Sequence, residues 1–242
     1  MTSLRSFVFL LLCFLMLLPY SVAVVLLIRA SPRVIYSLGS SYATVMNRLL
    51  KVLCDIDVEV EGRENLPNVP CVALIKHSSP WETLALFLVI PPSVIVLKRE
   101  LMWIPIFGWA LASLRSIAIN RKAGRSAMGQ ILVQGKNRLQ EGLWVNIFPE
   151  GTRVPKGQVG RFGIGGAVLA CEARARIVPV AHNAGDHWPS GKLKKIPGKI
   201  TLRIGPAIDT SGKTPEQINI EARTWMVDTM KEISPAHHNP TT

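Results

Sequence analysis

The segment at residues 76–83 combines residue types that can move a proton. It reads KHSSPWET, and His77 follows a short apolar run, 71–75, that has the pattern of a buried strand. Glu82 lies across the corner between this strand and the helix expected after it. A carboxylate bonded to one imidazole nitrogen fixes the tautomer, and the other nitrogen can then accept a proton. The segment therefore suggests a general base at His77, oriented by Glu82.

The same spacing has a second interpretation. Ser79 and Glu82 have the pattern of a helix capping box, in which the carboxylate accepts the Ser79 N–H and does no chemistry. Ser79 would then cap the helix, and Pro80 would occupy its first turn. A lone histidine after a strand is also more often structural than catalytic, so the segment alone leaves both interpretations open.

A second polar segment, 148–153 (FPEGTR), follows another apolar run. Gly151 allows a tight turn, Thr152 and backbone N–H groups can donate to an anion, and Arg153 can bind phosphate oxygens with two hydrogen bonds. Glu150 is positioned to orient the guanidinium or to bind an acceptor hydroxyl. The alternative is a polar turn with a surface ion pair.

Two more strand ends carry cations, at Lys98–Arg99 and at Arg121–Lys122. Each pair alone is typical of a solvated charge cluster. Basic residues at three strand ends are, however, what a phosphate pocket needs. We therefore expect Lys98 and Arg121 beside Arg153.

Taken together, the segments resemble the motifs of the glycerolipid acyltransferase family, which includes the bacterial 1-acyl-sn-glycerol-3-phosphate acyltransferases. The resemblance covers residues 60–210, and its motifs stand in the family's order at 77–82, 98–108, 148–153 and 178–181. The third motif matches nearly letter for letter. Two positions depart from the family: Glu82 stands where aspartate is usual, and Lys76 where asparagine is familiar.

The resemblance implies a reaction and a set of site residues. An acyl chain would pass from acyl-CoA or acyl-carrier protein directly to the free hydroxyl of 1-acyl-sn-glycerol 3-phosphate (lysophosphatidate). The implied catalytic residues are His77 and Glu82, and the implied substrate-binding residues are Lys98, Arg121, Glu150, Gly151, Thr152 and Arg153. No cysteine or serine stands in a nucleophile context such as GxSxG, so we expect no acyl-enzyme, and we expect neither a metal nor a cofactor.

Other functions stay open at this point. The acceptor can be another lysophospholipid or a lyso-ornithine lipid, and hydrolysis would follow if water replaced the lipid hydroxyl. A non-enzymatic basic protein that docks on anionic membranes is an alternative of another class. An apolar stretch that overlaps the second motif suits a wall for the acyl chain, although core packing explains most of it: Trp103, Ile104, Ile106, Phe107 and Trp109.

The N-terminus predicts attachment to a membrane. Residues 7–28 carry no charge and are long enough to cross a bilayer, either as a single span or as a shallow hairpin broken near Pro19. A cleaved signal peptide is disfavoured because the apolar run continues past its small-residue site, 21–23. Arg29 and Arg33 follow the segment, so the positive-inside bias places the main domain on the cytoplasmic side of the inner membrane.

Composition agrees with this picture. The formal net charge is +12, and neither zinc-finger spacing nor an RNA-recognition pattern is present, so we expect an anionic membrane surface and no nucleic acid as partner. The 4 cysteines have no CxxC spacing, which suits reduced thiols. From residue 56 strands alternate with helices. We predict a membrane-associated helical segment at 1–55 and an acyltransferase domain at 56–242, an α/β sandwich with a largely buried central sheet flanked by helices.

Overall fold

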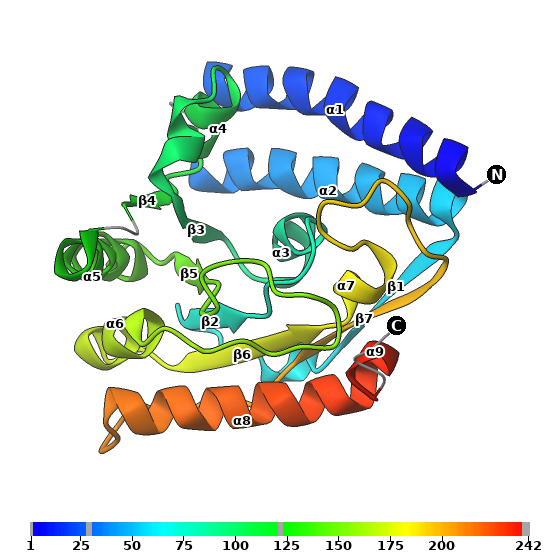
Figure 1. The fold of residues 1–242 in the computed structure, drawn as a ribbon. Helices are drawn as coiled ribbons and strands as arrows, with labels where there is room; N and C mark the ends of the chain where they lie inside the picture. Colours follow the sequence, from blue (N-terminus) through cyan, green and yellow to red (C-terminus); the bar gives the residue numbers. More distant parts are fainter. Residues whose placement is uncertain (1, 28–30, 121–122, 239–242) are drawn as a thin grey trace.

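Residues 2–27, 31–120 and 123–238, which the computed structural model describes, contain a seven-stranded sheet with helices on both faces (Figure 1). The strand order is β1-β7-β6-β2-β5-β3-β4. All neighbours are parallel except β6 and β7. The strands are β1 (Ile56–Glu61), β2 (Val72–Ile75), β3 (Ser93–Lys98), β4 (Ile117–Ile119), β5 (Trp144–Ile147), β6 (Ile177–His182) and β7 (Gly198–Ile204). The predicted α/β fold is confirmed.

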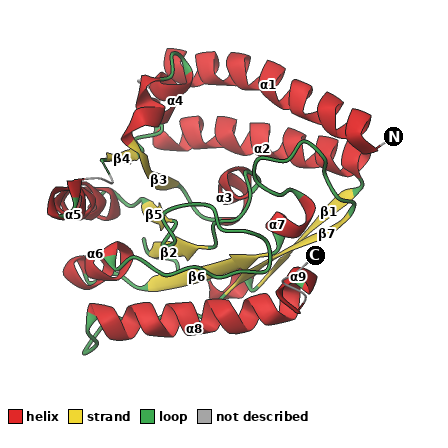
Figure 2. Cartoon of the chain, in the orientation of Figure 1, coloured by secondary structure: helices red, strands yellow, loops and turns green. Residues whose placement is uncertain are grey.

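The helices form a layer on each face of the sheet (Figure 2). Helices α5, α6 and α8 cover one face, α2 and α3 cover the other, and α1 lies outside α2. The helices are α1 (Thr2–Leu26), α2 (Pro32–Cys54), α3 (Glu82–Val89), α4 (Phe107–Ser113), α5 (Arg125–Gln140), α6 (Gly165–Ala173), α7 (Ala184–His187), α8 (Pro215–Ile233) and α9 (Pro235–His238).

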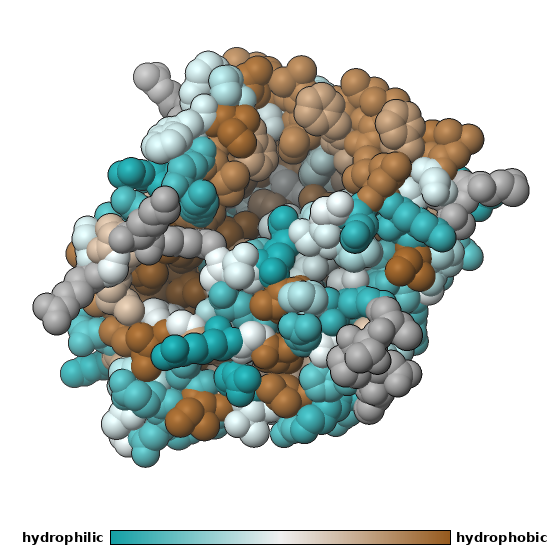
Figure 3. All heavy atoms as spheres, in the orientation of Figure 1, coloured by the Kyte–Doolittle hydropathy of each residue, from teal (hydrophilic) through white to brown (hydrophobic). Residues whose placement is uncertain are grey.

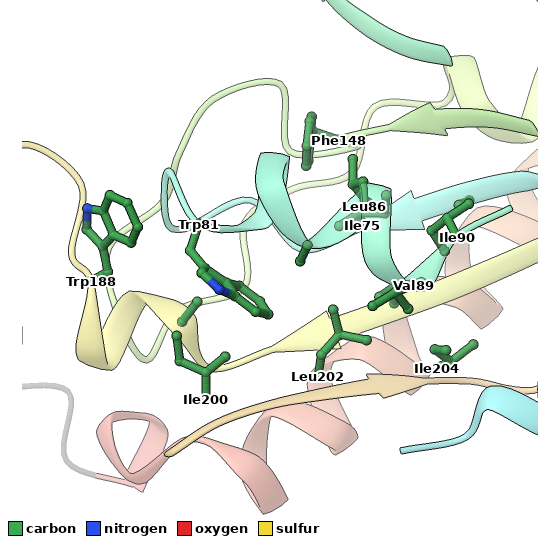
Figure 4. Close-up of a cluster of buried hydrophobic side chains, with 14 of the residues drawn as sticks. Ile75, Trp81, Leu86, Val89, Ile90, Phe148, Trp188, Ile200, Leu202 and Ile204 are labelled. Carbon is green, nitrogen blue, oxygen red and sulfur yellow. The ribbon is translucent and has the colours of Figure 1, made fainter. Parts of the chain in front are cut away.

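The apolar runs in the sequence arise because the central strands are buried on both faces. In β2, Ala73 and Ile75 pack under α2 and α3, whereas Val72 and Leu74 pack under α5, α6 and α8. All four are 0% exposed. Figure 4 shows the first of these cores, where Trp81 and Leu86 meet side chains from β2 and β7.

The pattern of β1 differs from that of the other strands, and it is not among the predicted ones. Residues 56–61 (IDVEVE) alternate apolar with acidic side chains, and β1 lies at the edge of the sheet beside β7. Ile56 is buried and Asp57 and Glu59 are exposed. An edge strand with one solvated face has no continuous apolar run.

Helix α1 is continuous through Pro19, so of the two shapes that the sequence left open the hairpin broken near Pro19 is excluded. Proline removes one helical hydrogen bond, but the packing of α1 against α2 is undisturbed around it. The Tyr20 hydroxyl lies 3.1 Å from Ser41 Oγ, and its ring lies 5.2 Å from that of Tyr42. The chain instead reverses after α1, and α2 returns alongside it.

The start predicted for the helix after β2 is also wrong, because Ser79 is not its N-cap. Helix α3 has Trp81 at its N-cap, because Ser79 stabilises the preceding turn by accepting the Trp81 N–H at 3.2 Å. Helix α8 begins with a capping box formed by Thr214 and Gln217.

Candidate active site

The predicted polar segments meet because the carboxyl ends of three neighbouring parallel strands lie side by side. β2 pairs with β5 on one side and with β6 on the other. His77 follows β2, the segment 148–153 follows β5, and His182 is the last residue of β6. Sheet topology therefore brings residues from distant parts of the chain to one place.

His77 and Glu82 are in direct contact. Nδ1 of His77 and Oε1 of Glu82 form a short hydrogen bond. The other oxygen, Oε2, accepts the backbone N–H groups of Ser79 at 2.7 Å and of Ser78 at 3.3 Å. Glu82 therefore makes the contacts expected from both interpretations, since one oxygen accepts the Ser79 N–H and the other holds the imidazole, although Ser79 is not the N-cap of α3.

The second nitrogen of His77 has the properties of a base. Since the carboxylate can only accept, Nδ1 carries the proton and Nε2 keeps a free lone pair. No described residue hydrogen-bonds to Nε2 of His77. The side chain is 11% exposed, and its ring stacks on Phe148 with the centroids 4.3 Å apart. Stacking and the carboxylate fix the ring in one orientation.

Glu82 stays ionised although its side chain is 0% exposed. Burial raises the pKa of this carboxyl, but hydrogen bonds from His182 and His77 outweigh burial and hold the pKa at about 2. Nε2 of His182 lies 3.2 Å from Oε2 of Glu82. The carboxylate thus lies between two imidazoles.

A buried ion pair fixes the backbone at His77. Nζ of Lys76 lies 3.0 Å from both carboxylate oxygens of Glu150, and the two side chains are 1% and 0% exposed. The same carboxylate accepts the N–H of His77 at 2.8 Å and of Gly160 at 2.7 Å. Val154 donates its N–H to the carbonyl of His77 at 2.9 Å. The loop after β5 therefore holds the backbone of His77 from both sides.

His77 opens onto a cavity of about 460 Å³. Its walls are mostly apolar side chains of α1, α2, α3, α4 and β3. Among the described residues that line it, Lys98 and Arg153 carry a positive charge. A volume of this size suits a small-molecule ligand or an acyl chain.

The predicted substrate-binding residues divide into two groups. Lys98 and Arg153 line the cavity, and Nε of Arg153 lies 3.9 Å from Oε1 of Glu82. Gly151 has a φ of 69° in the turn after β5, and Thr152 beside it is exposed; neither lines the cavity. Arg121 lies outside the described residues.

Glu150 requires a correction. Its carboxylate is fully buried and makes the contacts with Lys76, His77 and Gly160 given above. A carboxylate enclosed in this way holds the site together and does not reach an acceptor hydroxyl.

Comparisons with known proteins agree with the geometry. A family model described as Acyltransferase matches residues 57–183. The 1-acyl-sn-glycerol-3-phosphate acyltransferase of Pseudomonas aeruginosa is 48% identical over 190 residues, which cover 77% of this chain and 74% of that protein. The chain belongs to the acyltransferase family. The 1-acyl-sn-glycerol-3-phosphate acyltransferase alpha of Mus musculus is 31% identical over 191 residues, which cover 76% of this acyltransferase and 67% of the mouse protein.

A solved structure supports the fold. The 1-acyl-sn-glycerophosphate (LPA) acyltransferase PlsC from Thermotoga maritima superposes with a TM-score of 0.81. The match covers 96% of this acyltransferase and 95% of that chain, at 22% identity.

The apolar wall of this acyltransferase differs from the sequence-based expectation. Of the five residues predicted from the stretch 103–109, Phe107 lines the cavity. Trp103, Ile104 and Trp109 are instead exposed by 66%, 45% and 58%. The cavity wall comes mainly from helices distant in sequence, which the apolar composition of one stretch does not reveal.

Sequence analysis missed two features of the acyltransferase site. His182 directly follows the fourth motif, and its position at the end of a buried strand was the available signal. The Lys76–Glu150 pair joins two motifs, and opposite charges at two strand ends were its signal. Among the described residues, no group of three or more His, Cys, Asp or Glu side chains has an arrangement that could hold a metal ion.

Proposed function

We propose that this acyltransferase moves a fatty acyl chain from acyl-CoA or acyl-carrier protein to the free hydroxyl of 1-acyl-sn-glycerol 3-phosphate, giving phosphatidate. The observation that carries the proposal is the contact of His77 with Glu82 beside an apolar cavity that is also lined by two cations. The names of the relatives support the same acceptor.

Nε2 of His77 removes the proton of the acceptor hydroxyl, and the oxygen attacks the thioester carbonyl. Glu82 stabilises the imidazolium that forms. The tetrahedral intermediate then expels the thiolate, which takes the proton back from His77 and leaves as the thiol. The acyl group passes directly to the acceptor, with no acyl-enzyme and no cofactor besides the thioester donor.

The acceptor phosphate binds to Arg153 and Lys98, which line the cavity with His77. A guanidinium matches two phosphate oxygens, and an ammonium adds a second positive charge. Gly151 and Thr152 do not line the cavity, and the Gly151 N–H donates to the carbonyl of Phe148 at 3.0 Å, so we assign both residues to the turn that carries Arg153.

The test is a matrix of donors and acceptors on purified protein. Acyl-CoA and acyl-carrier protein are each offered with lysophosphatidate, lysophosphatidylglycerol, a lyso-ornithine lipid or no acceptor. We expect phosphatidate to form fastest. Faster transfer to another lysolipid would show that this lipid, and not lysophosphatidate, is the acceptor. Release of free fatty acid without acceptor would indicate hydrolysis. Vesicle binding without thioester consumption would overturn the enzymatic proposal.

Arg153→Ala should raise the KM for lysophosphatidate by about 10- to 100-fold and change the KM for the acyl donor little, because a charge-assisted contact with phosphate is lost. Initial rates at varied acceptor concentration measure this effect. Arg176→Ala is the matched control, since Arg176 is exposed and precedes β6 at the opposite end of the strand. An unchanged acceptor KM in Arg153→Ala would show that Arg153 does not bind the acceptor phosphate.

We also propose that α1 attaches the enzyme to the cytoplasmic face of the inner membrane without crossing it. Within the described residues, Ser3–Leu26 is long and apolar enough to span a membrane. Both ends of α1 are, however, tied to the domain: Ser6 accepts the Lys195 N–H at 2.9 Å, and Val24 is buried against Ile35 and Ala110. A helix fixed along its length to a folded domain suits an interfacial position.

The outward face of α1 is the surface for this contact. Leu11, Phe14 and Leu18 are exposed by 44%, 73% and 53%, and Figure 3 shows a nearly continuous hydrophobic band over the helix. Trp103 and Trp109 are exposed near α4, which packs against α1. Aromatic residues of this kind favour the headgroup region.

Phe14→Glu should weaken binding to vesicles that contain anionic lipid, because a charge replaces an apolar side chain at the interface. Flotation of purified protein with vesicles measures the bound fraction. Val133→Glu is the control, since Val133 is 65% exposed on α5, on the opposite face of the sheet. Equal flotation of both variants would contradict the proposed surface.

A further inference from the structure

His182 lies beside the catalytic pair but has no part in the mechanism described so far. It is the last residue of β6 and is 0% exposed. β6 pairs directly with β2, where Ile75 lies opposite Val180, so the end of β6 lies next to the backbone that leads to His77. Its ring also meets the edge of Trp81, with the centroids 5.7 Å apart.

The hydrogen bonds of His182 define its tautomer. Nδ1 accepts the N–H of Ala184 at 3.3 Å, and Nε2 lies 2.9 Å from the carbonyl oxygen of Lys76. An amide N–H can only donate and a carbonyl can only accept. His182 is therefore neutral, with its proton on Nε2.

The same nitrogen also lies close to the catalytic carboxylate. Nε2 of His182 lies 3.2 Å from Oε2 of Glu82, the oxygen that also accepts the N–H groups of Ser78 and Ser79. Two backbone N–H groups and Nε2 of His182 thus surround Oε2, whereas Oε1 contacts His77 and lies 3.9 Å from Nε of Arg153. A carboxylate held by one oxygen cannot rotate away from the imidazole bonded to the other.

We propose that His182 is a positioning residue, whose Nε2–H fixes the carboxylate of Glu82 so that it orients His77 for proton transfer. The proposal rests on the proposed function, since it assigns Glu82 the role of orienting a base. The carboxylate of Glu82 contacts both histidines.

Two amide variants that differ by one methylene test the role of the donor. In His182→Gln the side-chain NH₂ can reach the place of Nε2, whereas in His182→Asn it falls short. We expect His182→Gln to keep kcat within about threefold of the parent protein. His182→Asn and His182→Phe should lower kcat by about 10- to 100-fold, since a hydrogen bond to a charged group is lost, and should leave the acceptor KM within about twofold.

Controls separate positioning from folding. Thermal unfolding of each variant gives the folded fraction, and His187→Gln should behave as the parent, because the ring of His187 contacts the carbonyl of Ile196 and not Glu82. If His182→Phe does not fold, the comparison of the Asn and Gln variants decides. Equal kcat in the Asn and Gln variants would overturn the positioning role. A parent protein that forms no phosphatidate would instead overturn the proposed function.

Discussion

His77→Ala is expected to lower kcat by at least about a hundredfold, because the variant has no base to take the proton of the acceptor hydroxyl. General-base catalysis contributes about 10²–10⁴ in rate, or about 3–5 kcal/mol of the barrier. The KM values should change less, since the acceptor phosphate binds to other residues. Steady-state rates with saturating lysophosphatidate and acyl donor measure the effect.

His187→Ala is the control for the loss of an imidazole, because His187 lies outside the catalytic contacts. Thermal unfolding should remain close to that of the parent in both variants. Near-normal turnover in His77→Ala would eliminate His77 as the base. Acid quench of the parent protein during turnover with labelled donor should leave no label on the chain, and a covalent acyl-protein would contradict direct transfer.

Glu150→Gln is expected to lower the free energy of unfolding by about 3–5 kcal/mol, because it leaves the Lys76 ammonium buried without a counter-charge. The main effect is on stability. Activity should also fall, because the carboxylate holds the backbone at His77. Chemical denaturation at fixed pH measures it.

The double variant that combines Lys76→Met with Glu150→Gln should recover part of the lost free energy of unfolding. The double variant removes the cation, while the amide introduced by Glu150→Gln can still accept a backbone N–H. A double variant no more stable than Glu150→Gln alone would show that the unpaired ammonium is not the cause.

The pH dependence of Glu150→Gln follows from Lys76. Burial lowers the pKa of Lys76 from its ordinary value of 10.5, and Glu150 opposes this effect. Without Glu150 the pKa falls further, and between that pKa and 10.5 the unfolded chain binds more protons than the folded one. Stability therefore rises with pH through this window. The loss of stability in Glu150→Gln should be largest below the pKa of Lys76 in the folded variant and should become smaller at alkaline pH.

The sequence was sufficient for the local chemistry of the site. His77 and Glu82 are close in the chain, so the strand-to-helix corner alone brings their side chains within reach of each other. The central strands were also predictable, because strands buried on both faces must be apolar throughout. Strand β1 was missed because an edge position gives it an alternating pattern with a solvated face.

The sequence did not predict the role of Glu150. A carboxylate next to Arg153 suggested a contact with ligand, but in the folded chain its charge is matched by Lys76, which follows a different strand. The sequence left the path of α1 open for a similar reason. Pro19 indicates a break from local propensity, and packing against α2 maintains the helix through it.

Motif order and residue type by themselves indicated the family, the central strands and the contact of His77 with Glu82, because each strand and each motif is formed by residues near one another in the chain. Only the tertiary structure decided that His182 contacts Glu82, that Lys76 neutralises Glu150, and that α1 and α2 help to wall the cavity. Such contacts depend on which strands are neighbours in the sheet and on how the helices pack over it. The physical reason is that hydrogen bonding between strands and burial of side chains bring together segments that are far apart in the sequence. No local sequence pattern shows which segments these are.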